Sequence, residues 1–174
     1  YFCGFMTQGF SLISENGAAD VWVMDPAVDS VERSINIPDS ALSQVRGVQG
    51  VRFAAPLALG SAEVRFPNGQ FQLFQVIGVD DATLIGVPAT AGTDRSGLRA
   101  PEAVIVDAGG TSGKLQTPLS RADQWPRDGV HLDVPTRELG SGDELLVNEQ
   151  LVRVLARSEG LPRFPPRPLM YTTL

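Results

Sequence analysis

The amino-acid sequence predicts a mixed α+β domain built from short elements. Two β-type runs flank Asn68-Gly69, the strongest short-range signal of a hairpin, because both residue types tolerate a positive φ. A helix-start pattern, Pro38-Asp39-Ser40, precedes one short apolar helical face. The 18 glycines and 13 prolines among 174 residues exceed ordinary usage and indicate many turns. This length fits one domain, or two small domains closely joined.

In the first half of the chain the sequence predicts three elements before the hairpin turn. A strand over 18–24 is closed by Asp25-Pro26. The helix after Pro38 carries an apolar face and ends at Gly47 and Gly50. An extended run over 51–66 follows, and its Pro56 and Gly60 indicate an edge position or a bulge. The apolar face of the helix consists of Ala41, Leu42, Val45 and Val48.

The second half of the chain predicts further short strands separated by loops. The strand 71–79 returns from the Asn68-Gly69 turn, and 103–106 is a short buried strand. A strand is also predicted over 131–134. An antiparallel pair, 144–147 with 151–157, is joined across 148–150, and 169–174 has strand composition.

The charge and the counts of reactive residues narrow the classes of function. Fourteen basic and twenty acidic residues give a net charge of −6, which argues against nucleic acid as a partner. Lys114 is the one lysine and the arginines are spread singly along the chain, so no polybasic patch for an anionic membrane can form. Single copies of cysteine, Cys3, and histidine, His131, exclude an intrachain disulfide and any metal centre that needs two imidazoles.

The residues that could carry chemistry do not form a catalytic constellation. Gly109 to Lys114 lacks the glycine spacing and the following Ser or Thr of a phosphate-binding loop. Ser112 lacks the Gly-x-Ser-x-Gly elbow, and His131 is interpreted as a hydrogen-bonded structural residue. The acidic residues near 80 and 143 belong to turns. We therefore expect no catalytic residue, no cofactor and no metal.

The first fourteen residues carry no charge, and their large apolar side chains follow a helical spacing. One interpretation is a helix packed on the domain core; the other is a stalk that continues a transmembrane helix. Fourteen residues are too few to span a bilayer, which needs about 20. The face consists of Phe2, Phe5, Met6, Phe10 and Ile13.

A proline-rich segment precedes the final predicted strand. Proline excludes helix and central strand and favours an extended polyproline II conformation. The segment is interpreted as a stiff connector, and a ligand for an aromatic-lined groove is the alternative. Its prolines are Pro162, Pro165, Pro166 and Pro168.

Three segments, in order, resemble the extracytoplasmic core domain of ABC transporter permeases of the MacB-like and FtsX-like group, and in particular DevC-type exporter permeases. The first is Ala19-Asp-Val-Trp-Val-Met-Asp25, similar to a "GADIWVMD" segment of these permeases. The second is Val48-Gln-Gly-Val-Arg-Phe-Ala-Ala-Pro56. The third is Gly142-Asp-Glu-Leu-Leu-Val-Asn148 with the strand 152–156. Glu149 stands where the family usually has glycine, so we expect a turn wider than two residues there.

The resemblance implies a division of the chain. Residues 1–17 would form a stalk helix that continues a transmembrane helix, and 18–80 the first part of a porter-like αβ subdomain. An inserted, mostly-β subdomain would span 81–142, and 143–174 would return to the porter-like part, which the family continues beyond Leu174.

The resemblance also implies a function. The chain would be a non-catalytic periplasmic domain of an inner-membrane ABC exporter permease. It would transmit ATP-driven movement of membrane helices to contacts with a periplasmic adaptor or with substrate. Its partners would be a separate ATPase subunit, a second permease protomer and a membrane-fusion adaptor protein. A secreted or membrane-anchored ligand-binding or sensor domain is the alternative.

Overall fold

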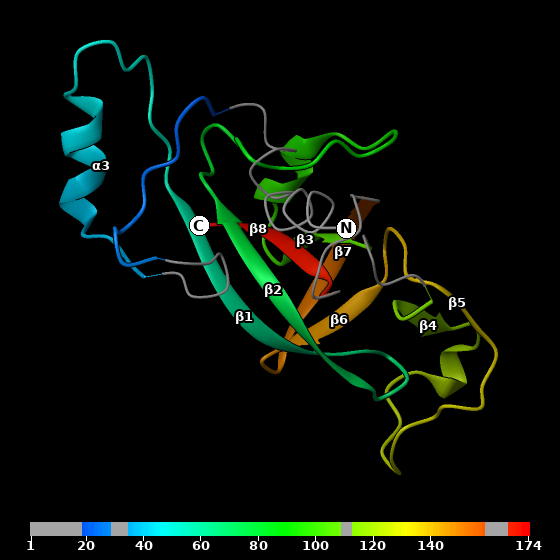
Figure 1. Cartoon of the computed structure of the whole chain (residues 1–174). Coiled ribbons are helices and arrows are strands. Elements are labelled where there is room, and N and C mark those ends of the chain that lie inside the picture. The colour runs from blue at the N-terminus through cyan, green and yellow to red at the C-terminus, as the bar shows by residue number, and fades with distance from the viewer. Residues whose placement is uncertain (1–18, 29–34, 109–112, 159–166) are drawn as a thin grey trace, which may run out of the picture.

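Six strands form a closed β-barrel in the order β1-β2-β8-β3-β7-β6, with β6 returning to β1 (Figure 1). The computed structural model describes residues 19–28, 35–108, 113–158 and 167–174. The barrel strands are β1 (Leu57–Arg65), β2 (Phe71–Val79), β3 (Ala103–Asp107), β6 (Glu144–Val147), β7 (Gln150–Ser158) and β8 (Leu169–Thr173).

The β1–β2 hairpin confirms the prediction from Asn68-Gly69. The strands pair antiparallel along their full length, from Leu57 with Val79 to Arg65 with Phe71. In the turn, the Gly69 amide donates to the Phe66 carbonyl (2.9 Å). Gly69 has a φ of 89°, whereas Asn68 does not adopt a positive φ. Glycine therefore supplies the left-handed residue that a three-residue hairpin loop requires.

Strand β8 joins two parts of the chain that are far apart in sequence. It pairs parallel with β2 and antiparallel with β3, and β3 pairs parallel with β7. The predicted strands 103–106 and 169–174 are therefore neighbours in the barrel. Parallel pairs need long connections, which is why local sequence patterns identify the strands without identifying their partners.

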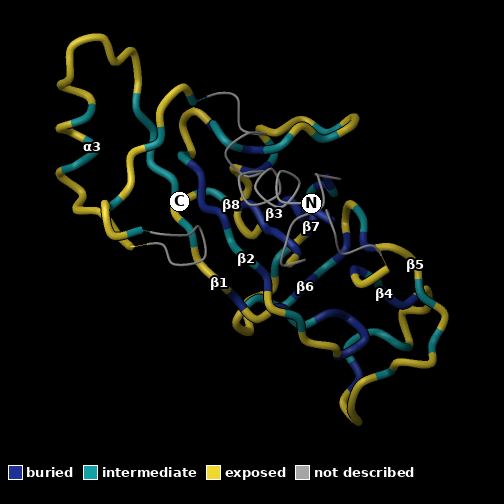
Figure 2. Tube along the Cα trace, in the orientation of Figure 1, coloured by how far each residue is buried: buried dark blue, intermediate teal, exposed yellow. Residues whose placement is uncertain are grey.

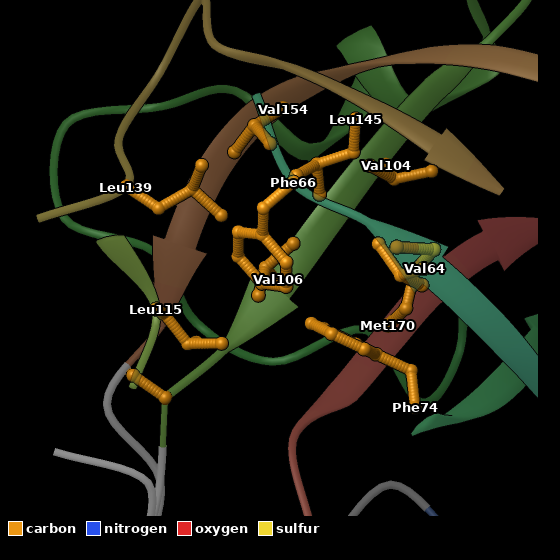
Figure 3. Close-up of a cluster of buried hydrophobic side chains, with 11 residues drawn as sticks. Val64, Phe66, Phe74, Val104, Val106, Leu115, Leu139, Leu145, Val154 and Met170 are labelled. Atoms are coloured by element: carbon orange, nitrogen blue, oxygen red, sulfur yellow. The ribbon is translucent and has the colours of Figure 1, made fainter. Parts of the chain in front are cut away.

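The barrel interior is one of two hydrophobic clusters (Figure 3). Phe74 is fully buried and lies 6.0 Å from Phe66, centroid to centroid, at a tilt of 39°. Burying such side chains contributes roughly 1.5–3 kcal/mol each. The other buried members are Val64, Val104, Val106, Ala108, Leu115, Leu139, Leu145, Val154 and Met170.

The second cluster lies on the outer face of the sheet, under the segment 80–100. Leu84, Val87 and Leu98 from that segment cover Ile77 and Tyr171. A register shift against β3 leaves one extra residue, Leu155, on β7. Such a bulge reverses the side-chain alternation, so Val154 lies inside the barrel and Ala156 in the outer cluster.

Residues 113–139, called the lobe, form a small unit at one end of the barrel (Figure 1). It contains β4 (Gln116–Pro118) paired antiparallel with β5 (Thr136–Glu138), and the 3-10 turn Arg121–Asp123. Leu115 and Leu139 flank these strands and belong to the barrel core. The strand predicted over 131–134 is wrong: residues 131–135 are irregular and the strand begins at Thr136.

Residues 19–28 and 35–56, called the arm, extend from the other end of the barrel (Figure 1). They include α3 (Asp39–Arg46), which confirms the predicted helix and ends at Gly47. None of these residues is buried, as Figure 2 shows. The strand predicted over 18–24 is wrong within the described residues: 19–24 is irregular, because it has no strand partner there and Val21 is 76% exposed.

The extended run predicted over 51–66 is confirmed only in its second part. Strand β1 begins at Leu57, after Pro56, and residues 51–56 have no strand pairing. Proline lacks the amide donor that a ladder needs. β1 also pairs with β6 only at Val64 and Arg65, so its first half is an edge, as Pro56 and Gly60 indicate.

The β6–β7 hairpin is confirmed, but the expectation of a turn wider than two residues is wrong. Val147 pairs with Gln150, so Asn148 and Glu149 alone form the loop. Their φ values of 47° and 68° are those of a type I′ turn, which matches the twist of the strands. Glu149 therefore occupies a position where glycine fits without strain.

The described part of the chain is mostly strands with one α-helix, so the predicted mixed α+β class is confirmed in this coarse form. Residues 1–17, predicted as a stalk helix, lie outside the described residues. Within the described ranges, no helix combines the length and hydrophobicity that a bilayer span requires.

Candidate functional site

Most of the side chains predicted to act lie outside the described residues. These are Phe2, Phe5, Met6, Phe10 and Ile13 of the stalk face and Pro162, Pro165 and Pro166 of the connector. Pro168 is described, and its carbonyl accepts a hydrogen bond from the Gln75 amide (3.1 Å). The described end of the connector is thus bonded to β2 directly before β8 begins.

The first two family-like segments both lie in the arm. Segment 19–25 is irregular, and the Asp25 carboxylate at its end accepts a hydrogen bond from the Ala27 amide (2.8 Å). Segment 48–56 follows α3, and the Arg46 guanidinium donates to the Ala54 carbonyl at 3.0 and 3.1 Å. One of these contacts lies within 25–27 and the other joins α3 to the segment that follows it, while large apolar side chains such as Val21 and Phe53 remain exposed.

The third family-like segment forms the β6–β7 hairpin, and its aspartate is an internal clamp. Asp143 is 9% exposed and accepts two hydrogen bonds from Arg137, Nη1 to Oδ2 at 2.7 Å and Nη2 to Oδ1 at 2.5 Å. It also accepts from the Gly140 amide (2.8 Å). The two hydrogen bonds with Asp143 raise the pKa of Arg137 above its usual value, since they favour the charged guanidinium.

A second ion pair lies beside the first. Arg157 of β7 donates to Glu138 of β5 (Nη1 to Oε2, 2.5 Å). Arg137 and Glu138 are consecutive in β5. Asp143, the partner of Arg137, directly precedes β6, and Arg157, the partner of Glu138, lies in β7. The β5 strand of the lobe is consequently fixed to the barrel by charge-assisted hydrogen bonds, which are stronger than neutral ones.

The turn of the β1–β2 hairpin is also bonded to the lobe. The Trp125 amide donates to the Pro67 carbonyl (2.6 Å), and the His131 amide donates to the Asn68 carbonyl (2.9 Å). The Arg65 guanidinium donates to the Pro126 carbonyl (3.3 Å). The lobe is therefore bonded to the barrel at two hairpins, β1–β2 and β6–β7.

His131 has the structural role that the sequence predicts. Its Nε2 lies 3.1 Å from Asp128 Oδ1 and its Nδ1 lies 4.0 Å from Asp123 Oδ1. Both carboxylates belong to the lobe, so the ring crosslinks the loop that contains it. No hydrogen bond in the described residues joins the imidazole to a hydroxyl or thiol nucleophile.

The strand before the glycine-rich loop ends in a buried polar pair. Ser158 Oγ donates to Asp107 Oδ2 (2.7 Å), and the two residues are register partners on β3 and β7. Residues 109–112 of the loop lie outside the described residues, and Lys114 after them is exposed. No group of three or more His, Cys, Asp or Glu side chains within the described ranges could hold a metal ion.

The clamp residues were not predicted as a site from the sequence. The sequence pattern predicts only that Asp143 belongs to a turn, whereas the structure shows that its side chain is buried. No sequence pattern indicates a role for Arg137, because an isolated arginine in a polar stretch has no periodicity. The Gly-Asp pair in the third family-like segment was the available indication that this carboxylate has a specific partner.

Comparison with known proteins adds structural matches. No protein-family model and no curated protein matches the chain. Among solved structures, the extracellular domain of the noncanonic ABC-type transporter YknZ from Gram-positive bacteria matches with 14% identity and a TM-score of 0.45, covering 79% of this chain and 62% of that chain. The periplasmic region of MacB from Actinobacillus actinomycetemcomitans matches with 10% identity and a TM-score of 0.42, covering 79% and 55%. The chain thus spans less than two thirds of either structure.

Proposed function

We propose that this chain is a non-catalytic extracytoplasmic domain of an ABC exporter permease. The observation that supports this most strongly is the order of the three family-like segments, the first of which begins at Ala19 and the last of which ends at Ala156. ATP hydrolysis then occurs on a separate subunit or domain, consistent with the lack of a phosphate-binding loop pattern in this sequence.

The arrangement of bonds gives the proposal a mechanical basis. A domain that transmits movement needs rigid parts joined so that they move together. Two charge-assisted contacts join the lobe to the β6–β7 hairpin: Arg137 with Asp143, and Glu138 with Arg157. Backbone hydrogen bonds also join the lobe to the β1–β2 turn. In this proposal the barrel and lobe therefore move as one body.

In this proposal, movement reaches the barrel and lobe through the stalk, 1–17. Its uncharged face, from Phe2 to Ile13, acts as the lever that carries movement of the membrane helices. The proline-rich connector from Pro162 to Pro168 is a stiff second link, because proline restricts the backbone. It leads into β8, which pairs on both sides.

The proposal includes the partners and the location that the resemblance implies. The permease lies in the inner membrane, with this domain in the periplasm, and it works with an ATPase subunit, a second protomer and a periplasmic adaptor protein. The division at 18–80, 81–142 and 143–174 is part of this proposal. In the middle range, 81–142, β3 is a barrel strand, whereas the lobe and the segment 81–100 lie outside the barrel.

A charge on the stalk face tests the lever in the full transporter. Phe10→Glu is expected to reduce export and to uncouple it from ATP hydrolysis, because a carboxylate disfavours an apolar interface. Gln8→Glu is the matched control, since position 8 lies away from the apolar stripe at helical spacing. Transport unchanged by Phe10→Glu would contradict the lever.

Cell fractionation tests the location separately. The transporter proposal expects the full gene product in the inner-membrane fraction, with this domain accessible to protease only from the periplasmic side. Recovery as a free protein in the medium or periplasm would favour the ligand-binding alternative.

A further inference from the structure

Most of strand β1 has a partner on only one side. It pairs with β2 along its whole length, but on its other side β6 reaches it only at Val64 and Arg65 (Figure 1). The preceding carbonyl, that of Glu63, accepts from the Asn148 amide in the β6–β7 turn (3.2 Å). Residues 57–62, called the free edge, extend beyond this turn. Within the described ranges no strand pairs with them on that side.

The register shows which backbone groups of the free edge point away from β2. The Phe66 amide donates to the Gln70 carbonyl (2.8 Å), so the even-numbered residues of β1 are the ones that bond to β2. The odd-numbered residues Leu57, Leu59 and Ser61 therefore direct their N–H and C=O groups to the other side. None of these groups has a backbone partner among the residues that the structure describes.

The free edge lacks the features that usually prevent the addition of a strand. Natural edge strands are protected by charged side chains, prolines or bulges, whereas the sequence Leu-Ala-Leu-Gly-Ser-Ala of 57–62 contains no charge or proline and its register is regular. Ala58, Gly60 and Ser61 are exposed. A Cβ at Gly60 would meet no atom within 4 Å beyond its chain neighbours. Another backbone can therefore approach this edge closely.

The side chains around the free edge indicate what kind of segment fits it. Leu57 and Leu59 are only partly buried against the outer cluster, so the outer face of the edge is apolar. At the other end lie two exposed carboxylates, Glu63 and Glu149, joined through the bond from Asn148 to Glu63. Neither carboxylate forms an ion pair with another described residue. A matching segment has apolar side chains on one face and a basic residue at the carboxylate end.

We propose that the free edge binds an extended peptide segment of a partner protein, which joins the sheet as a further strand. Unpaired N–H and C=O groups in alternation match the backbone of another strand, and peptides bind sheet edges in this way. The added strand runs antiparallel to β1, as β6 does on the same side. Its basic residue is therefore at its N-terminal end, beside Glu63 and Glu149. The proposal rests on the geometry of β1 and does not depend on the transport function.

Amide hydrogen exchange of the unmodified chain tests whether the edge is free. The amides of Leu57, Leu59 and Ser61 are expected to exchange at least about tenfold faster than those of Ala58 and Gly60, which donate to β2. Equal protection of the two sets would overturn the proposal, because the edge would then already have a partner.

A synthetic hexapeptide, Lys-Val-Thr-Val-Thr-Val with blocked ends, is the probe for binding. In the proposed register its three valines lie opposite Ser61, Leu59 and Leu57, and its lysine lies beside Glu63. NMR titration is expected to give a dissociation constant below about 1 mM, with the largest shifts at the amides of the free edge. Absence of binding, or shifts confined to the arm or the lobe, would overturn the proposal.

Methylation of the peptide backbone tests whether binding uses backbone hydrogen bonds. Methyl groups on the three valine nitrogens remove the donors that face β1, so this peptide is expected not to bind. Methyl groups on the two threonine nitrogens face away from β1 and are the matched control, with binding retained. Equal affinity of the two methylated peptides would contradict strand addition. The protein is unmodified in this comparison, so its folding does not affect the result.

Ser61→Pro tests the same contact from the protein side. Proline removes one outward amide and leaves the bonds between β1 and β2 in place, so binding of the hexapeptide is expected to weaken at least about tenfold. Ser61→Ala changes the side chain but keeps the amide, and this control is expected to bind like the unmodified chain. Unchanged binding by Ser61→Pro, with the fold retained by circular dichroism, would contradict the proposed edge.

A peptide with its lysine at the other end, Val-Thr-Val-Thr-Val-Lys, tests the orientation. It is expected to bind the unmodified chain about two- to fivefold more weakly than the first peptide, the worth of an exposed ion pair. The double variant Glu63→Gln, Glu149→Gln is expected to bind both peptides equally. Equal affinities for the unmodified chain would contradict the antiparallel order. These experiments use the 174-residue chain and the stalk experiment uses the full transporter, so either proposal can fail without the other.

Discussion

Arg137 and Asp143 form a bidentate ion pair that joins the lobe to the β6–β7 hairpin, with N–O distances of 2.7 and 2.5 Å. The carboxylate side is 9% exposed and the guanidinium side 46%. The pair lies at the boundary between the lobe and the barrel, so its geometry determines how rigidly the lobe is held.

Asp143→Asn tests this clamp. The substitution retains the shape of the side chain but removes its charge, and it is expected to lower the free energy of unfolding by about 1.5–3 kcal/mol, as for hydrogen bonds to charged groups. Urea denaturation measures the change. Glu63→Gln, at an exposed position of β1, is the control and is expected to change stability by less than about 0.5 kcal/mol. Equal effects would show that Asp143 contributes no more than a surface charge.

Glu149→Gly is expected to stabilise the protein. Glu149 has a φ of 68°, a left-handed conformation that costs an L-residue roughly 1–2 kcal/mol and glycine almost nothing. After the entropy cost of glycine, the net gain is about 0.5–1 kcal/mol. Gln150→Gly, one residue later in β7, is expected to destabilise instead. Thermal denaturation of the two variants distinguishes the effect of the turn from that of the residue type.

Gly69→Ala tests the contact between the β1–β2 turn and the lobe. A Cβ at Gly69 would lie 2.9 Å from the Gly129 carbonyl oxygen, in addition to the strain of a φ of 89°. Gly92 has a φ of 71° with open space around it, so Gly92→Ala isolates the strain, roughly 1 kcal/mol. Gly69→Ala is expected to cost at least about 1 kcal/mol more. It should also speed hydrogen exchange at the His131 amide, and unchanged exchange would argue against a displaced lobe.

Asp94 is expected to titrate below its ordinary pKa of 3.8. The Ser96 hydroxyl and amide donate to its carboxylate at 2.6 and 2.9 Å, and they lower the pKa because they favour the charged form. Since the folded pKa lies below the unfolded one, this interaction stabilises the fold above the unfolded pKa. The contribution is lost as the pH falls through the folded pKa. Carbon-13 NMR titration measures the shift, and Ser96→Ala should return the pKa towards 3.8.

The sequence predicted elements whose signals are local. The β1–β2 hairpin follows from Asn68-Gly69 and the alternation around it, and α3 follows from its start and stop residues. The barrel could not be predicted in the same way, because β8 finds its partners in β2 and β3, far away in the chain. The predicted strand over 18–24 has the right composition, but strand composition produces a strand only where a partner is present.

The clamp was not predictable for a related reason. Arg137 lies in β5, which pairs with β4, and Asp143 follows the turn at Gly140 to Gly142, so their contact depends on how these two segments are placed in the fold. From the sequence, an aspartate directly after a glycine-rich turn is interpreted as a turn residue, whatever its partner in the fold. Burial, which distinguishes Asp143 from the other acidic residues of its region, is a property of the assembled lobe and barrel.

The position of β8 in the ring has a consequence for biosynthesis. β8 is the last of the six strands in chain order, yet it lies between β2 and β3, so β2 and β3 have no ladder between them until it is present. At a synthesis rate of roughly 5–20 residues per second, the ribosome needs on the order of ten seconds to proceed from β1 to β8. During that time the side chains of the future barrel core, Phe74 among them, lack part of their cover. We therefore expect chaperones to protect the nascent chain until β8 emerges and closes the ring.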